Sequence, residues 1–108
     1  MPRNLIVCID GTANQYGTVN TNAVHLYKRL IKDPDRQLAL YEPGVGTFSS
    51  HFGHGLTTNI ENSYRFLMAE YRPGDRIYLF GFSRAAYAVR ALAGTLDGLR
   101  EDSVFVYT

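Results

Sequence analysis

The sequence predicts an α/β fold, in which a parallel β-sheet lies between two layers of helices. Two short runs without charge inside them, residues 4–9 and 77–80, have the composition of strands covered on both faces. Apolar residues at helical spacing follow each strand, and strands that alternate with helices form parallel sheets with right-handed crossovers. The length of 108 residues fits a single domain, residues 1–108.

Turn and cap residues mark the expected bounds of each element. Strands are expected at residues 4–9, 37–41 and 77–80, and residues 104–107 can add a short last strand. Helices are expected from a cap at Asn20, Thr21 or Asn22 to about Lys32, from a cap at Thr57, Thr58 or Asn59 to about Tyr71, and from Ala85 to Leu96. The Gly- and Ser-rich segment Gly44–Gly55 is predicted to be a long loop.

Composition excludes several classes of protein. A net charge of +1 offers no electrostatic basis for binding nucleic acid or an anionic membrane. The chain has neither a run of transmembrane length nor a signal-peptide core, which favours the cytoplasm or secretion by a route that needs no signal peptide. The single cysteine, Cys8, cannot form an internal disulfide. No ligand cluster has metal-binding spacing and no glycine pattern fits a nucleotide, so neither metal nor cofactor is expected.

Ser83 stands where a predicted strand turns directly into a predicted helix. The segment Gly81-Phe82-Ser83-Arg84-Ala85 matches the nucleophile-elbow pattern G-x-S-x-G, with Ala85 in place of the second glycine. In this pattern the serine backbone is strained, so that its hydroxyl stands above the sheet edge. The residues two before and two after the serine crowd each other and must be small. The pattern indicates a nucleophilic serine; the alternative is an ordinary connection in which Ser83 caps a helix.

Backbone N–H groups near this turn are candidates for binding negative charge. The Arg84 N–H lies at the start of a helix, where the helix dipole adds partial positive charge. Asp10, Gly11 and Thr12 follow the first strand, and the carboxyl ends of parallel strands meet at one edge of a sheet. We therefore expect the N–H of Gly11 or Thr12 to be the second oxyanion donor. Asp10 is expected at the edge of the same site.

Three motifs together resemble a known family. They are Cys8-Ile9-Asp10-Gly11-Thr12-Ala13-Asn14, Tyr41-Glu42-Pro43-Gly44-Val45-Gly46-Thr47, and the run from Gly81 to Gly94. The sequence resembles, over about residues 4–96, an uncharacterised α/β-hydrolase domain family that includes the catalytic domain of type VI secretion phospholipase effectors. The resemblance implies an α/β-hydrolase-like fold, Ser83 as the nucleophile, and a lipid or phospholipid ester as substrate.

The general base is the missing part of this interpretation. In the α/β-hydrolase fold the acid and the histidine follow the nucleophile, but the 25 residues after Ser83 contain no histidine. His25 belongs to a solvated helix stripe, whereas His51 and His54 lie in the Gly-rich segment, which could fold over the site. We expect a fold truncated after the nucleophile elbow, with the base absent or supplied by His51 or His54.

Two other functions stay open at this point. A sheet cut from a larger one exposes an edge, so the chain could be a catalytically incomplete module that forms a homo-oligomer or complements a partner chain. Asp10-Gly11-Thr12 also resembles the D-x-D-G-T loop of haloacid-dehalogenase phosphatases. There the first Asp is the nucleophile, and this sequence has Cys8 at that position.

Overall fold

The computed structural model describes residues 2–11, 22–43, 52–96 and 103–108, with the backbone alone at 52–57. The elements in chain order are β1 (Asn4–Ile9), α1 (Asn22–Arg29), β2 (Gln37–Glu42), α2 (Phe52–Glu70), β3 (Arg76–Gly81), α3 (Ala85–Thr95) and β4 (Val104–Tyr107). The predicted alternation of strands and helices is confirmed, and the short last strand is present.

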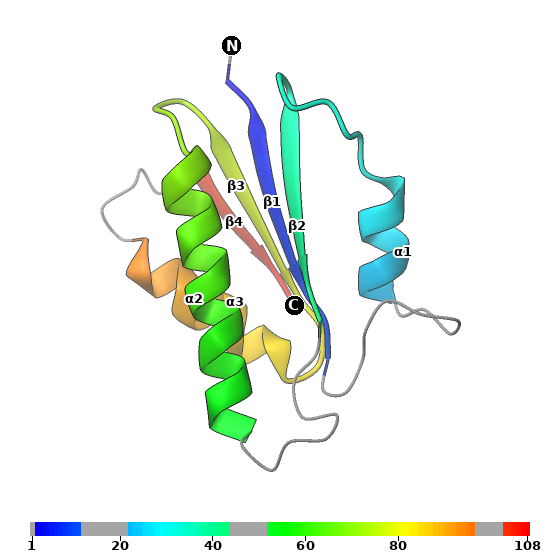
Figure 1. Ribbon diagram of the computed structural model, residues 1–108, viewed down its shortest axis with the longest axis vertical. Coiled ribbons are helices and arrows are strands. Elements are labelled where there is room, and N and C mark those ends of the chain that lie inside the picture. The colour runs from blue at the N-terminus through cyan, green and yellow to red at the C-terminus, as the bar shows by residue number, and fades with distance from the viewer. Residues whose placement is uncertain (1, 12–21, 44–51, 97–102) are drawn as a thin grey trace.

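The four strands form one parallel sheet in the order β2-β1-β3-β4 (Figure 1). The chain passes from β1 to β2 on one side of β1 and then returns to β3 on its other side. Ile9 is the register partner of both Glu42 and Gly81, so three strands end at the same level. In open α/β sheets, ligands bind beyond the carboxyl ends of the strands where the strand order reverses. Here that point lies between β1 and β3.

Helices cover both faces of the sheet, with α1 on one face and α2 and α3 on the other (Figure 1). The main core lies between the sheet and α2 and α3, and its fully buried members include Leu5, Val7, Ile9, Leu67, Ile77, Leu79, Val89 and Leu92. On the opposite side, Ala23 and Val24 of α1 are fully buried. The predicted layers, helix on sheet on helix, are therefore those of the structure.

Helix α1 ends at Arg29, earlier than the sequence predicted. Lys32 lies beyond the helix, and its Nζ donates hydrogen bonds to the carbonyls of Tyr27 and Leu30. The same ammonium group lies 4.2 Å from the centroid of the Tyr27 ring. A lysine that reaches back in this way satisfies carbonyls that a longer helix would otherwise bond. Ile31, which would belong to the helix if it ran to Lys32 as predicted, lies beyond it and is 54% exposed.

Helix α2 begins at Phe52, and the predicted start at residues 57–59 is wrong. Asn59 does not cap the helix: its Nδ2 donates to the Pro43 carbonyl over 3.3 Å. The Ser63 hydroxyl donates to the Asn59 carbonyl over 2.7 Å, and both side chains are buried. Asn59 therefore ties the helix to the end of β2. Residues 52–55 of the predicted loop are helical, so that part of the prediction is wrong, and residues 44–51 lie outside the described residues.

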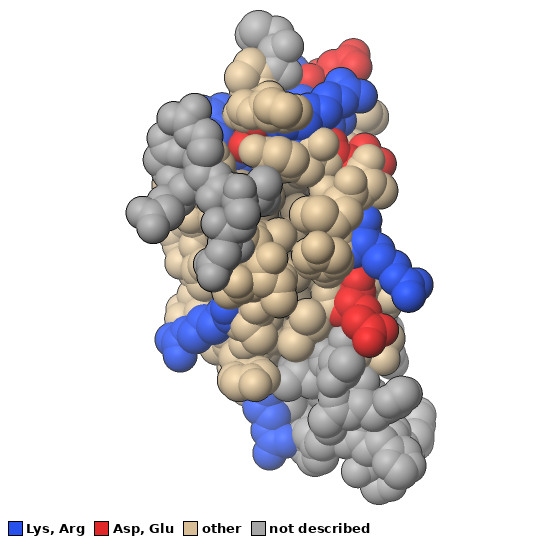
Figure 2. All heavy atoms as spheres, turned by 90° about the vertical axis from the view of Figure 1, so that its left-hand side faces the viewer, with Lys and Arg blue, Asp and Glu red and all other residues tan. Residues whose placement is uncertain are grey.

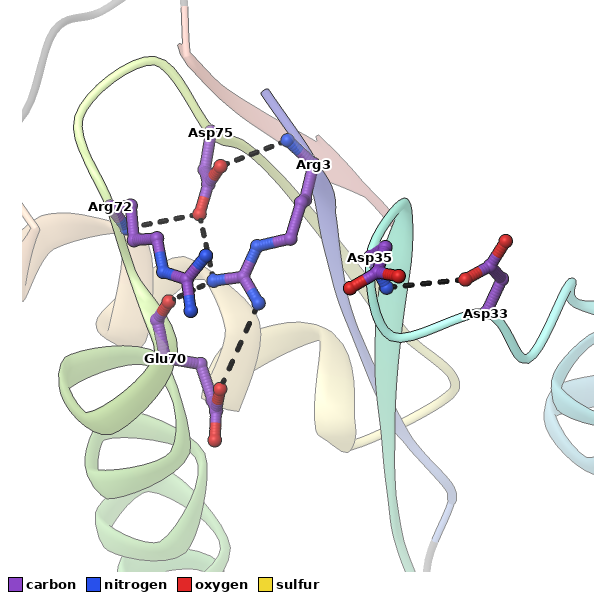
Figure 3. A network of polar contacts seen from close by, with 6 residues as sticks. All are labelled: Arg3, Asp33, Asp35, Glu70, Arg72 and Asp75. Atoms are coloured by element: carbon purple, nitrogen blue, oxygen red, sulfur yellow. Dashed lines mark hydrogen bonds and ion pairs between the residues drawn. The ribbon is translucent and has the colours of Figure 1, made fainter. Parts of the chain in front are cut away.

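A buried ion pair fastens the opposite end of the sheet (Figure 3). Asp75 accepts hydrogen bonds from the Arg3 N–H and the Arg72 N–H, each over 2.9 Å, and from the Arg3 guanidinium over 3.3 Å. Arg3 also donates to the carbonyl of Glu70. Arg3 and Asp75 are 4% and 1% exposed, so β1 is locked to the turn between α2 and β3. Figure 2 shows charged atoms of both signs gathered at this upper end of the molecule.

Candidate active site

Ser83 lies in a very tight turn between β3 and α3. Only Phe82, Ser83 and Arg84 separate the last strand residue from the first helical one. Ser83 has φ +59° and is the one non-glycine residue with positive φ in the described ranges. Such a backbone costs about 1–3 kcal/mol and persists only where surrounding structure enforces it. The residue is exposed, so the turn presents a strained serine to solvent at the carboxyl edge of the sheet.

Close packing of the strand end against the helix start enforces this turn. A Cβ atom on Gly81 would lie 2.5 Å from the Ala85 carbonyl oxygen and 2.7 Å from Cγ2 of Val89. Real Cβ atoms do not approach backbone so closely, so position 81 admits only glycine without rearrangement. Ala85 is 2% exposed and fits beneath the same turn. The predicted need for small residues on both sides of Ser83 agrees with this packing.

The alternative in which Ser83 caps a helix disagrees with the geometry. The residue that precedes α3 is Arg84, which has helical backbone angles (φ −62°, ψ −25°) and no side-chain capping bond. No hydrogen bond joins the Ser83 hydroxyl to another residue in the part of the chain that is described. Its carbonyl accepts the Ala86 N–H over 3.0 Å, as in an ordinary first turn. The serine side chain is thus not used to start the helix.

The loop after β1 begins beside the serine turn. The Phe82 N–H donates to the Ile9 carbonyl over 3.2 Å, which fastens the turn to the end of β1. Asp10 follows Ile9 directly and is 2% exposed. Its N–H donates to the Glu42 carbonyl over 2.9 Å, so the loop is also held to β2. The predicted meeting of the Asp10 loop and Ser83 at one edge is therefore found in the structure.

The Asp10 carboxylate organises the start of this loop. Its Oδ1 accepts the Gly11 N–H over 2.8 Å, and its Oδ2 accepts the Tyr41 hydroxyl over 2.6 Å. The Gly11 N–H, a predicted oxyanion donor, is thus bonded to the Asp10 carboxylate in this structure. The other predicted donor, Thr12, lies outside the described residues.

Two residues at the end of β2 join this edge without having been assigned a role from the sequence. Burial, and then the hydrogen bond to Asp10, raise the pKa of Tyr41 above its ordinary value. Burial also raises the pKa of Glu42, and a 3.2 Å hydrogen bond from Asn62 opposes that shift. Their position in the sequence, at the end of a predicted strand, could have marked Tyr41 and Glu42 as residues of this edge. That the Tyr41 hydroxyl reaches Asp10 follows only from the pairing of β2 with β1 in the structure.

Residues 3–99 match the catalytic domain of type VI secretion system phospholipase effectors of the Tle1-like kind. The chain belongs to this family. The chain is also 36% identical over 118 residues to the uncharacterized protein YEL023C of Saccharomyces cerevisiae. That match covers 88% of this chain and 17% of the yeast protein, so the chain spans about a sixth of its relative. No solved structure matches. The resemblance inferred from the three motifs is confirmed.

The structure describes the three histidines considered as a general base to different extents. His25 is exposed on α1, as the sequence predicted. His54 falls within α2, where the backbone alone is described, and His51 lies outside the described residues. Within the described ranges no three His, Cys, Asp or Glu side chains converge as metal ligands would. None of the described helices combines the length and apolar character needed to cross a bilayer.

Proposed function

We propose that this chain carries the nucleophile of a serine hydrolase that cleaves lipid or phospholipid esters, and that Ser83 is that nucleophile. One observation carries the proposal: Ser83 is exposed, with φ +59°, at a turn where Gly81 has no room for a side chain. A serine held so sharply at the carboxyl end of a central strand is the arrangement that acyl-transfer enzymes use. The substrate class comes from the family, which is one of phospholipase effectors.

The reaction would proceed by acyl transfer through the serine oxygen. Ser83 Oγ attacks the ester carbonyl carbon while a general base takes the hydroxyl proton, and the carbonyl oxygen becomes an oxyanion. The oxyanion collapses, the alcohol leaves with a proton, and water then releases the acyl group by the same steps. The proposed base is a histidine, either His51, His54 or one supplied by another part of the protein.

Two backbone N–H groups are proposed to hold the oxyanion, those of Arg84 and Thr12. Arg84 immediately precedes α3, at the end of the helix where the dipole is positive. Gly11 could serve only after giving up its bond to Asp10. The Tyr41–Asp10–Gly11 contacts fix the chain as far as Gly11, the residue before Thr12, and donors fixed in advance stabilise an oxyanion by about 3 kcal/mol each.

Release of fatty acid from phospholipid vesicles tests this proposal. The wild-type protein and the variants Ser83→Ala and Tyr87→Phe are compared, since Tyr87 is an exposed residue of the same helix. We expect Ser83→Ala to lower the rate by at least about 10³-fold and Tyr87→Phe to leave it unchanged. Equal rates in wild type and Ser83→Ala would overturn the assignment of the nucleophile.

A second candidate function is that of a module completed by another chain. Two aromatic pairs join β3 and β4 on the face of the sheet that α1 covers. The ring centroids of Tyr78 and Phe105 are 5.1 Å apart, and those of Phe80 and Tyr107 are 4.9 Å apart. Strand β4 is an edge of the sheet, and Tyr107 is 48% exposed. An apolar edge strand favours pairing with another chain. Light scattering that finds dimers at micromolar concentration would support this function, and a monomer throughout would exclude self-association.

The phosphatase alternative has less support. The position of its nucleophile is occupied by Cys8, which is fully buried in the middle strand of the sheet. Burial raises the pKa of the Cys8 thiol to about 11, so the thiolate is scarce at neutral pH. A buried, protonated thiol cannot replace the aspartate that forms the phosphoenzyme.

A further inference from the structure

A polar groove lies at the amino ends of the strands, away from Ser83. It encloses about 540 Å³, and its polar lining comes from Asn4, Asp35, Arg36, Gln37, Arg72 and Arg76. The strands that begin here are six residues long and end at the serine edge. At about 3.3 Å per residue the groove and the serine edge are separated by roughly 17 Å. A ligand in the groove therefore does not reach Ser83.

Positive charge dominates this groove. Three guanidinium groups and one carboxylate line it, in a chain whose net charge is only +1. Arginine presents several N–H donors in a planar fork, which matches the geometry of phosphate oxygens. The charge and the donor geometry together favour a phosphate group over a cation or an apolar ligand.

A chain of hydrogen bonds holds one arginine in place. The Arg76 Nε donates to the Asn4 Oδ1 over 3.2 Å, and the Asn4 Nδ2 donates to the Gln37 Oε1 over 3.2 Å. Gln37 in turn donates to the Ile31 carbonyl over 3.0 Å. Because Arg76 is anchored through Nε, its two Nη nitrogens remain for a ligand. An anchored side chain loses less conformational freedom when it binds.

The other two arginines have fixed backbones and available side chains. The Arg36 N–H donates to the Asp33 carbonyl over 2.8 Å, and the Arg72 N–H donates to Asp75 over 2.9 Å. Neither guanidinium forms a hydrogen bond or ion pair with a residue in the described ranges, and no dashed line reaches that of Arg72 in Figure 3. Both side chains are therefore available to an anion in the groove.

We propose that this groove is a phosphate-binding site, with Arg76 as its fixed donor and Arg36 and Arg72 closing on the bound group. The single carboxylate, Asp35, leaves a lining charge that matches a phosphate dianion. The phosphate can belong to a small soluble molecule or to a lipid headgroup, since both present the same oxygens. The site is independent of ester hydrolysis at Ser83.

Calorimetry with inorganic phosphate and glycerol phosphate tests the site, and flotation with vesicles of phosphatidylcholine with or without phosphatidylglycerol tests the lipid source. We expect Arg76→Gln and Arg36→Gln each to weaken binding by about tenfold or more. The control Arg65→Gln, an exposed change on α2, should bind like wild type. Ser83→Ala should also bind phosphate like wild type. The binding result can therefore be interpreted even if Ser83 is not the nucleophile.

The soluble phosphates and the vesicles distinguish the two possible sources of the phosphate group. Binding of the soluble phosphates without vesicles identifies a small-molecule ligand, and binding of the phosphatidylglycerol vesicles identifies a headgroup, provided that the arginine variants lose it. Because the Arg36 guanidinium forms no hydrogen bond or ion pair with a described residue, Arg36→Gln should fold even if Arg76→Gln does not, and circular dichroism checks both. Absence of binding to every probe, or binding that Arg36→Gln leaves unchanged, would overturn the proposal.

Discussion

At the scale of single residues, the strained backbone of Ser83 goes together with the close packing around Gly81. The positive φ of Ser83 brings the end of β3 and the start of α3 so close that a Cβ atom on Gly81 would overlap the Ala85 carbonyl. The motif G-x-S-x-[GA] let us predict this crowding from the sequence alone. What the sequence could not show is the fate of the Gly11 N–H, which depends on where the Asp10 carboxylate turns.

A Cβ at position 81 should disrupt the serine turn. We expect Gly81→Ala to lower the free energy of unfolding by about 1–3 kcal/mol, because the new atom would overlap the Ala85 carbonyl. Gly94→Ala is the matched control: nothing lies within 4 Å of the added atom, and alanine favours a helix by up to about 1 kcal/mol. Urea unfolding measures both. Equal effects at the two glycines would show that the turn is not closely packed.

The Tyr41 hydroxyl should stabilise the loop after β1. Tyr41→Phe leaves the buried Asp10 carboxylate short of a donor and should cost about 1–3 kcal/mol. Tyr27→Phe on α1 is the control, since no hydrogen bond joins the Tyr27 hydroxyl to another described residue, and its cost should stay below about 0.5 kcal/mol. Faster amide exchange at Gly11 in Tyr41→Phe, but not in Tyr27→Phe, would show that the Tyr41 hydroxyl stabilises the Asp10–Gly11 hydrogen bond. Unchanged exchange there would contradict it.

At the scale of elements, the hydrophobic pattern predicted which segments are strands and helices but not how they end. Helix α1 ends at Arg29, where Lys32 donates to the Tyr27 carbonyl, and α2 begins at Phe52, with Asn59 bonded to the Pro43 carbonyl just after β2 instead of capping the helix. The Asn59 bond joins residues 16 positions apart, so a local pattern does not contain it, whereas the Lys32 bond reaches only five positions back. The Arg3–Asp75 pair joins residues 72 positions apart, which is the longest separation among these contacts, and no local pattern predicted it.

Acid should weaken the Arg3–Asp75 lock. Burial alone would raise the pKa of Asp75, but hydrogen bonds from Arg3 and Arg72 outweigh it and hold the pKa below its ordinary value of 3.8. A depressed carboxyl pKa contributes stability that is complete above about pH 4 and is lost as the pH falls further. Asp75→Asn should therefore cost about 3 kcal/mol at pH 7, and less than that at pH 2.

Urea unfolding of Asp75→Asn and of the exposed control Glu61→Gln, at several pH values from 7 to 2, measures this difference. The control should follow the wild-type curve throughout. A cost for Asp75→Asn that is the same at every pH would mean that the charge on Asp75 does not stabilise the fold.

At the scale of the whole molecule, one sheet carries the proposed serine site at one end and the proposed phosphate site at the other. The carboxyl ends of β1, β2 and β3 bring together Asp10, Tyr41 and Ser83, which are far apart in sequence. The amino ends of the same strands carry the buried ion pair and the arginine-lined groove. Strand order made the first end predictable, since consecutive parallel strands share an edge. The groove was not predictable, because its arginines become neighbours only through strand register.

Covalent labelling of Ser83 by a fluorophosphonate tests the central claim most directly, because the reagent forms a bond only with an activated serine. The probe is applied to this chain and to a longer form of the protein that contains it, and the labelled residue is found by peptide mass spectrometry. We predict a single adduct on Ser83 that is absent from Ser83→Ala. Failure of both forms to react, or an adduct on a different residue that persists in Ser83→Ala, would contradict the account.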